Sequence, residues 1–243
     1  MAHLIVEIGN TALKAAWTEG GDSLGKTYRY QGEKPVDFIQ GITAKEKPEV
    51  LTVASVAGIS AADEKRLRGC CRQLLLLDEA HKSCLEGFGL PSYLTYDRAA
   101  AMVAARHMFV GKPCTVMDFG TTLNVDFIDA EGKYEGGNIS PGCRTRFKAL
   151  NRYSRALPLV DTPAEVSGTG HSIQESIENG VITGILFEIQ GYLASHPDNV
   201  VIFTGGDAIY FVKKIKTSIF VVCNLVLMGL SLITETYVEK NFQ

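Results

Sequence analysis

The fold is decided by the stretch LIVEIGNT (residues 4–11), a short apolar run that ends in a carboxylate, a glycine and a threonine. The same pattern returns as TVMDFGTT (residues 115–122), so an acidic-x-Gly-x-Thr motif begins at Glu7 and again at Asp118. A motif this short recurs by chance, and one copy alone carries little weight. Two copies, each at the end of an apolar strand pattern, favour two lobes of similar architecture.

The segments around the two copies predict similar mixtures of strands and helices. The first copy lies in a β-meander followed by alternating elements, with strands expected at 4–8, 12–18, 24–30, 50–56 and 73–77 and helices at 35–43, 61–69 and 99–109. After Gly111-Lys112-Pro113 the pattern restarts, with strands at 114–119, 124–129, 133–136 and 199–204 and helices at 143–155, 173–195 and 225–240. We therefore expect an α/β protein with an N-terminal lobe over 1–112 and a C-terminal lobe over 113–243, each a mixed sheet with an N-terminal meander flanked by helices.

Composition excludes several classes of function. The 243 residues are 46% hydrophobic and 21% charged, which is ordinary for a globular protein. A net charge of -3 provides no basic surface, so no nucleic-acid partner is expected. The most apolar run, 219–233, contains polar residues and is shorter than the ~20 residues of a membrane span, so no membrane partner is expected. Six cysteines without a CxxC pair, and no leader-like segment, predict reduced thiols in a cytoplasmic protein.

The two motifs suit the binding of a metal-bound nucleotide. Their glycines let the backbone turn sharply, so that N–H groups point at phosphate oxygens, and their threonine hydroxyls add donors. The carboxylates of Glu7 and Asp118 are suited to Mg²⁺, which proteins bind through one or two carboxylates together with substrate phosphates. Lys14 follows on the second strand and either supplies a positive charge for a phosphate or is a solvated lysine at a sheet edge.

A third glycine-rich turn, Thr204-Gly205-Gly206-Asp207, follows the strand expected at 199–204. Backbone at such a turn approaches a nucleotide closely, although any ordinary β-turn-α connection has the same composition. The chain has neither GxxxxGK[ST] nor GxGxxG, so we expect a nucleotide-binding fold other than the P-loop or Rossmann types. The segment 136–142 is rich in turn residues and is expected to fold over a ligand or an interface.

The tripeptide Tyr96-Asp97-Arg98 offers a candidate general base beside a candidate anion-binding arginine. Asp97 is able to accept a proton from a substrate hydroxyl that attacks a γ-phosphate, and Arg98 is able to bind a substrate carboxylate through its planar fork. The competing interpretation is a helix N-cap aspartate next to a surface arginine. The histidines lack metal-ligand spacing and no serine lies in a GxSxG elbow, so neither a metallohydrolase nor a triad hydrolase has support.

Taken together and in order, five motifs resemble those of type III pantothenate kinases. They are Glu7-Ile8-Gly9-Asn10-Thr11-x-x-Lys14, Tyr96-Asp97-Arg98, Asp118-Phe119-Gly120-Thr121, Gly136-Gly137-x-Ile139-x-Pro141-Gly142 and Thr204-Gly205-Gly206-Asp207-Ala208. The resemblance spans nearly the whole chain and implies an actin-like ATPase fold of two ribonuclease H-like lobes with the active site between them. It further implies a homodimeric enzyme that phosphorylates pantothenate with ATP to 4′-phosphopantothenate, the first step of coenzyme A biosynthesis, using Mg²⁺ and either K⁺ or NH₄⁺.

The resemblance also assigns roles to individual residues. Asp97 matches the catalytic base, and Asp118 matches the ligand of the monovalent cation, while Glu7 stays the candidate for Mg²⁺. The implied ATP-binding residues are Glu7, Ile8, Gly9, Asn10, Thr11, Ala12, Leu13, Lys14 and Thr121. The implied pantothenate-binding residues are Thr95, Tyr96, Asp97 and Arg98, with Phe88 and Ile173 at two further substrate positions of the family.

Four positions depart from the family's pattern. Glu7 stands where aspartate is usual and Thr95 where glycine is usual. Phe88 replaces a substrate-contacting tyrosine, and Ile173, beside Ser172, replaces a substrate-contacting threonine. Because most of these changes lie at the pantothenate end, two alternatives stay open: a kinase for another small molecule on the same scaffold, and a nucleotide-binding regulator without enzymatic activity.

Overall fold

The computed structural model describes residues 2–78, 80–81 and 83–242, apart from the side chains of residues 83, 84, 86 and 242. The chain forms two compact units. Unit 1 contains Met1–Val110 and Asn224–Gln243, and unit 2 contains Gly111–Cys223. The break after Val110 lies close to the expected one after residue 112, but the expected second lobe, 113–243, extends too far at its C-terminal end.

The last helix, α7 (Leu225–Phe242), belongs to unit 1 because it packs closely on α3 (Tyr96–Met108). Gly229 makes this approach possible, since a Cβ there would lie 1.8 Å from the carbonyl oxygen of Ala100. On the sheet side, the hydroxyl of Thr234 lies 2.6 Å from that of Thr52. An apolar helix of this kind is recognisable in the sequence, but its packing partner is not, because periodicity does not specify what covers a helix face.

The sheet of unit 1 combines a meander with two parallel strands. Its order is β3 (Thr27–Tyr30), β2 (Leu13–Thr18), β1 (His3–Ile8), β4 (Val50–Ser55) and β5 (Gln73–Leu77). The pairs β1/β2 and β2/β3 are antiparallel, whereas β1/β4 and β4/β5 are parallel. All residues of β4 are buried, as expected for a central strand covered on both faces.

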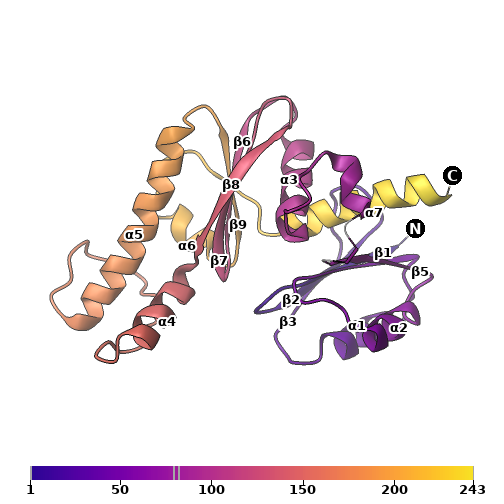
Figure 1. Cartoon of the computed structure of the whole chain (residues 1–243), viewed down its shortest axis with the longest axis horizontal. Helices are drawn as coiled ribbons and strands as arrows, with labels where there is room; N and C mark the ends of the chain where they lie inside the picture. Colours follow the sequence, from indigo (N-terminus) through magenta and orange to yellow (C-terminus); the bar gives the residue numbers. More distant parts are fainter. Residues whose placement is uncertain (1, 79, 82, 243) are drawn as a thin grey trace. The chain divides into compact units, whose positions relative to one another are not determined.

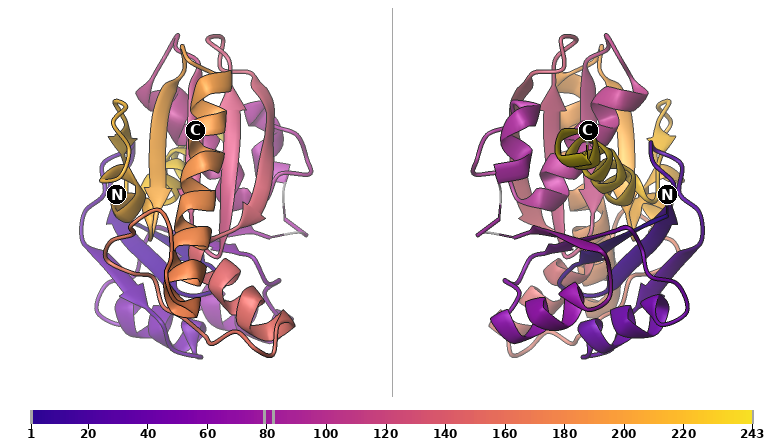
Figure 2. Two further views of the ribbon diagram at one scale, coloured as in Figure 1. Left: turned by 90° about the vertical axis from the view of Figure 1, so that its left-hand side faces the viewer. Right: turned by 90° about the vertical axis from the view of Figure 1, so that its right-hand side faces the viewer.

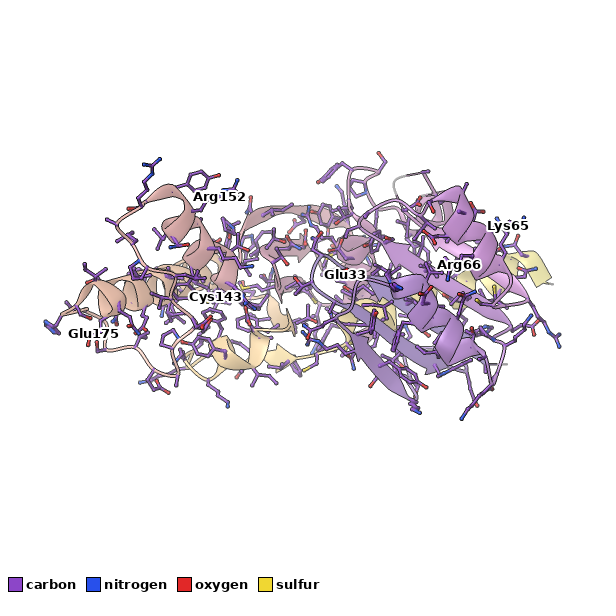
Figure 3. All side chains as sticks on the ribbon, turned by 90° about the horizontal axis from the view of Figure 1, so that it is seen from below. Glu33, Lys65, Arg66, Cys143, Arg152 and Glu175 are labelled. Carbon is purple, nitrogen blue, oxygen red and sulfur yellow. The ribbon has the colours of Figure 1, made fainter. Side chains whose placement is uncertain are left out.

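Helices cover both faces of this sheet (Figure 1). On one face α1 (Pro35–Thr43) and α2 (Ala61–Arg68) place Ile39 and Leu67 in a core with the apolar side chains of β1 and β4. The two helices are joined by an ion pair between Arg66, labelled in Figure 3, and Asp37. On the other face lie α3 and α7, and a short 3₁₀ helix, η1 (Ser83–Phe88), that the sequence pattern did not predict precedes α3.

The sheet of unit 2 repeats the same arrangement of strands. Its order is β8 (Tyr134–Pro141), β7 (Thr122–Ile128), β6 (Cys114–Phe119), β9 (Val200–Gly205) and β10 (Phe220–Val221). The meander β6–β7–β8 corresponds to β1–β2–β3, and β9 pairs in parallel with β6 as β4 does with β1. Glu7 and Asp118 therefore occupy the same place, one residue before the end of the first strand of each unit.

The core of unit 2 lies between this sheet and its helices. The helices are α4 (Cys143–Tyr153), α5 (Ile173–Ser195) and α6 (Ala208–Val212). Phe147 of α4, Ile185 of α5 and Phe203 of β9 are buried together there, and Figures 1 and 2 show α5 running along the face of the sheet. Figure 3 labels Cys143 at the start of α4 and Glu175 in the first turn of α5.

The segment 136–142 is mostly strand rather than a turn that folds over a ligand. It continues β8, which pairs with β7 from Ile128 to Thr122 and is interrupted by a register shift at Phe127/Ile128. Gly136 has a φ of +134°, a backbone conformation that favours glycine, so it accommodates the register shift in this edge strand. Among the described residues, no helix combines the length and the apolar character that a membrane crossing requires.

Candidate active site

Glu7 and Lys14 form an ion pair across β1 and β2. The antiparallel register places them directly opposite each other, and Lys14 Nζ lies 3.2 Å from Glu7 Oε2. The side chains are 12% exposed for Glu7 and 31% exposed for Lys14. Burial raises the pKa of Glu7, the charge and hydrogen bond of Lys14 oppose that rise, and the charge of Asp97 adds to it. Lys14 is thus partnered rather than a solvated edge-strand lysine.

The turn after Glu7 is a tight connection between β1 and β2, and its central residues are exposed. The N–H of Gly9 donates to the carbonyl of Ala12 at 3.1 Å, and Asn10 and Thr11 are exposed between them. In unit 2 the N–H of Gly120 donates to the carbonyl of Thr122 at 3.0 Å, with Thr121 exposed. Both motifs therefore end in tight turns that present hydroxyl and backbone groups to solvent, and the turn of unit 1 is one residue longer.

Asp97 lies in the first turn of α3 and is not its N-cap. The cap position belongs to Thr95, whose carbonyl accepts from the N–H of Ala99 at 2.9 Å. Within the part of the chain that the structure describes, the buried Oδ1 of Asp97 has no hydrogen-bond partner. The effect of Asp97 on the pKa of Glu7 places the two carboxylates within electrostatic reach of each other. The N-cap interpretation of Asp97 is therefore wrong.

The neighbours of Asp97 join α3 to the end of β1. Tyr96 is buried, and its hydroxyl donates to the carbonyl of Ile8 at 3.5 Å. Burial raises the pKa of the Tyr96 hydroxyl, with a smaller contribution from the charge of Asp97. Arg98 is also buried, with 7% of its surface exposed, so it is not the surface arginine of the competing interpretation. This packing fixes the position from which Asp97 projects.

The two further residues that were expected to contact the substrate lie in separate parts of the chain. Phe88 ends η1 in unit 1, is partly buried, and accepts a hydrogen bond at its carbonyl from Arg106 Nη1 at 2.7 Å. Ile173 is the first residue of α5 in unit 2 and is 61% exposed. The adjacent Ser172 caps α5, because its hydroxyl accepts from the N–H of Glu175 at 3.2 Å.

Asp118 lies beside a position that requires glycine. In the parallel pair of β6 and β9, Phe119 lies opposite Gly205, and Gly205 has a φ of +90°. A Cβ on Gly205 would lie only 2.4 Å from Asp118 Oδ1. The glycine therefore lets the backbone of β9 approach this carboxylate oxygen closely.

Thr121 is held by the start of α4. Its carbonyl accepts from the N–H of Gly142 at 3.0 Å and from the hydroxyl of Thr145 at 2.6 Å. A Cβ on Gly142 would lie 2.1 Å from the carbonyl oxygen of Gly120, so these two segments pack backbone against backbone. The motif that begins at Asp118 is thereby held rigidly at the end of its strand.

The third glycine-rich turn leads into α6, which is only five residues long. Such a short helix provides a weak dipole, so the expected contribution of its N-terminus to anion binding is small. The N–H of Asp207 donates to the carbonyl of Phe119 at 3.2 Å, which joins this turn to β6. Burial raises the pKa of Asp207, and the charge of Arg144 opposes the rise.

One residue near Asp118 was missed by the sequence analysis. Asn124 lies directly opposite Asp118 in the β6/β7 pair and is 7% exposed. A polar residue in the second strand of a hairpin whose first strand ends in the acidic-x-Gly-x-Thr motif is the signal that would have found it. A hollow of about 350 Å³ between β5 and α7 contains none of the candidate residues.

Comparisons with solved structures agree with the fold of the two units. The chain resembles in fold the activator of the 2-hydroxyisocaproyl-CoA dehydratase from Clostridium difficile (TM-score 0.61, 14% identity, 100% of this chain and 97% of that chain). It also resembles MreB5 of Spiroplasma citri bound to ADP (TM-score 0.52, 12% identity, 99% and 98%). Two mixed five-stranded sheets of this order define the actin-like ATPase fold, as expected from the sequence.

Sequence comparison identifies the family. The profile of type III pantothenate kinase matches residues 3–195. The type III pantothenate kinase of Bacteroides fragilis is 35% identical over 94% of this chain and 96% of its own length. The type III pantothenate kinase of Phocaeicola vulgatus is 36% identical over 94% and 96%. The chain belongs to the type III pantothenate kinase family, which confirms the resemblance seen in its motifs.

Proposed function

We propose that this chain transfers the γ-phosphate of ATP to the primary hydroxyl of pantothenate with Asp97 as the general base. Membership of the family defines the reaction as phosphorylation of pantothenate in coenzyme A biosynthesis. The observation that most directly supports the role of Asp97 is its buried Oδ1, for which the described residues provide no hydrogen-bond partner. Such an oxygen is suited to accept the proton of a substrate hydroxyl.

The phosphates of ATP are assigned to the turns of the two units. In unit 1 the assignment covers Glu7 to Lys14, where Asn10 and Thr11 are exposed at the turn. In unit 2 it covers Thr121, at the equivalent turn. Lys14 neutralises Glu7 and keeps enough exposure to approach a phosphate. Positioning and charge neutralisation then provide most of the rate, as is general in phosphoryl transfer.

Two cations are implied by the family, and the chain has oxygens suited to each. Lys14 contacts Oε2 of Glu7, so Oε1 is the oxygen assigned to hydrated Mg²⁺, which keeps several of its waters when bound. Asp118 is assigned to the monovalent cation, and its place in unit 2, equivalent to that of Glu7 in unit 1, supports that role. When bound, both ions offset the negative charge of the nucleotide phosphates.

Pantothenate is assigned to the start of α3. Arg98 would bind the pantothenate carboxylate through its fork, and Thr95 and Tyr96 would position the hydroxyl next to Asp97. Phe88 offers an apolar contact where the family's tyrosine offers a hydroxyl. Ile173 is assigned to the substrate as well, and its 61% exposure agrees with a surface that another molecule covers.

A homodimer through α5 is the arrangement that best accounts for the exposure of Ile173. Ile173, Gly180, Gly184, Phe187 and Gly191 follow one another at helical spacing, so they lie on one stripe of the helix. Phe187 is 67% exposed, and a Cβ added at Gly180 or Gly191 would meet nothing within 4 Å. A second copy of the same helix would cover this stripe in an isologous contact.

The test of the reaction is product identification with purified protein. ATP, Mg²⁺ and K⁺ are supplied with pantothenate or with a panel of other hydroxyl compounds, and products are identified by mass spectrometry. Phosphopantothenate and ADP in equal amounts are expected. A different preferred acceptor would replace the substrate assignment, and absence of transfer by folded protein that binds ATP would favour the regulator alternative.

A further inference from the structure

Unit 2 contains two buried asparagines that differ in how their side chains are satisfied. Asn179 is 5% exposed, its Oδ1 accepts from the N–H of Gly168 at 2.6 Å, and its Nδ2 donates to the carbonyl of Glu175 at 2.8 Å. Asn124 is 7% exposed, yet its buried Oδ1 has no partner among residues 2–78, 80–81 and 83–242. A buried acceptor without a partner is destabilising and rare, and it often marks the place of an ion or an ordered water.

The strand register places this amide in a row of oxygen-bearing side chains. Asn124 of β7 lies opposite Asp118 of β6, and Asp118 lies opposite Thr204 of β9. Residues directly opposite one another in adjacent strands point to the same face of the sheet. Thr204 is 2% exposed and Asp118 is half-buried, so all three side chains lie in a protected environment.

The chemistry of this row suits a weakly charged cation. Its side chains offer a carboxylate, an amide carbonyl and a hydroxyl, which are the oxygen donors that hard cations prefer. Only one of the three carries a negative charge, which fits a monovalent ion better than a divalent one. The oxygen that lacks a partner is the one adjacent to the carboxylate already assigned to the monovalent cation.

We propose that Asn124 Oδ1 is a second protein ligand of the monovalent cation at Asp118, an inference that rests on the proposed function. The ion would be the partner that Asn124 Oδ1 lacks among the described residues. In the same row, Thr204 lies opposite Asp118 on the other side. The role of Asn124 follows from β7 being paired with β6 along its length, which brings a residue of the second meander strand to the end of the first.

The experiment measures K⁺-dependent thermal stability and does not depend on catalysis. Tm is recorded for the full chain, with and without ADP, as K⁺ replaces Na⁺ at constant ionic strength. Three proteins are compared: wild type, Asn124→Leu and Asn179→Leu. The two variants make the same isosteric change at buried asparagines of one unit, but only Asn179 loses hydrogen bonds.

The wild type is expected to gain Tm as K⁺ replaces Na⁺. Asn124→Leu should raise the half-saturating K⁺ concentration by about tenfold or more, the usual range for loss of a group that supports a metal site. Without K⁺, Asn124→Leu should match or exceed the wild type in Tm, because the variant has no unpaired amide. Asn179→Leu should lower Tm and keep the wild-type K⁺ midpoint.

Two results would overturn the inference. One is a wild-type K⁺ midpoint in Asn124→Leu, which would mean that the amide does not contact the ion. The other is a wild type whose Tm does not distinguish K⁺ from Na⁺ in either nucleotide state. Neither result would affect the proposed reaction, because transfer of phosphate to pantothenate is measured separately by product identification.

Discussion

Lys14 Nζ lies 3.2 Å from Oε2 of Glu7, across the β1/β2 pair, and this contact sets the charge beside the turn that is proposed to bind the nucleotide. Burial disfavours the charged form of Glu7 and so raises its pKa, while Lys14 stabilises that charged form. Under the proposed function, the same lysine favours the ionised carboxylate and would also offer a positive charge to the nucleotide. Two predictions follow from this pair of roles.

Replacing Lys14 with methionine should weaken ATP binding and raise the pKa of Glu7 further. The loss of one hydrogen-bonded charge to a phosphate corresponds to about 1.5–3 kcal/mol, or roughly 10- to 150-fold in the ATP dissociation constant. Calorimetric titration with ATP at pH 7 and pH 6 measures both effects, because the binding defect should grow at the lower pH. Unchanged affinity at both values would show that Lys14 does not reach the phosphates.

Glu7→Gln should change the pH dependence of stability in a defined direction. Because the folded pKa of Glu7 lies above its ordinary value, its contribution to stability is fully present below the unfolded pKa and is lost as pH rises through the folded pKa. The variant cannot ionise at this position, so its free energy of unfolding, relative to that of the wild type, should be higher at pH 7 than at pH 4. Urea unfolding at the two pH values tests this, and a variant that is less stable relative to the wild type at pH 7 than at pH 4 would contradict it.

Gly205→Ala tests the close approach beside Asp118. The substitution places a Cβ 2.4 Å from Asp118 Oδ1 at a φ of +90°, and the left-handed backbone alone costs an alanine about 1–2 kcal/mol. Gly206→Ala is the matched control, since a Cβ there meets nothing within 4 Å. Urea unfolding should show a clear loss for the first variant and little change for the second, and equal effects would contradict the site geometry.

Gly229→Ala tests the assignment of α7 to unit 1. A Cβ would lie 1.8 Å from the carbonyl of Ala100, so α7 and α3 should separate and the free energy of unfolding should fall. Gly41→Ala in α1 is the control, because its Cβ meets nothing within 4 Å and alanine favours a helix by up to ~1 kcal/mol. Hydrogen exchange in α3 should accelerate only in the first variant. Unchanged exchange there would contradict the packing of α7.

Phe187→Glu tests the proposed dimer. A charge in the middle of the exposed stripe of α5 should prevent a second copy from covering it, and light scattering should report a monomer near 26.4 kDa. Ile209→Glu, at another exposed apolar residue of unit 2, should stay dimeric. A wild-type protein that is monomeric at assay concentrations would contradict the proposed dimer.

Most of the fold was predictable because it depends on short-range patterns. The all-apolar strand at β4 and the repeated motif at Glu7 and Asp118 carry their own signals in composition and spacing. The sequence failed where the outcome depends on long-range packing. The partner of α7 and the strand conformation of 136–142 depend on segments far away in the chain, and glycine-rich composition at an edge strand resembles that of a loop.

The candidate site shows the same division. The residue types at Glu7, Lys14 and Asp97 were recognisable as groups for phosphoryl transfer, but the Glu7–Lys14 ion pair depends on the register of β1 and β2. The unpartnered oxygens of Asp97 and Asn124 depend on everything packed around them, which no local pattern encodes.

The most direct test of the central claim is the rate of phosphate transfer to pantothenate by Asp97→Asn in K⁺ buffer. The amide is isosteric and leaves the packing of α3 intact, but it cannot accept the hydroxyl proton. We predict that kcat falls by about 10²- to 10⁴-fold, the range for loss of a general base, while Tm and the dissociation constant for ATP stay near wild type. A variant that keeps its fold and retains kcat within a few-fold of wild type would contradict the assignment of Asp97 as the base.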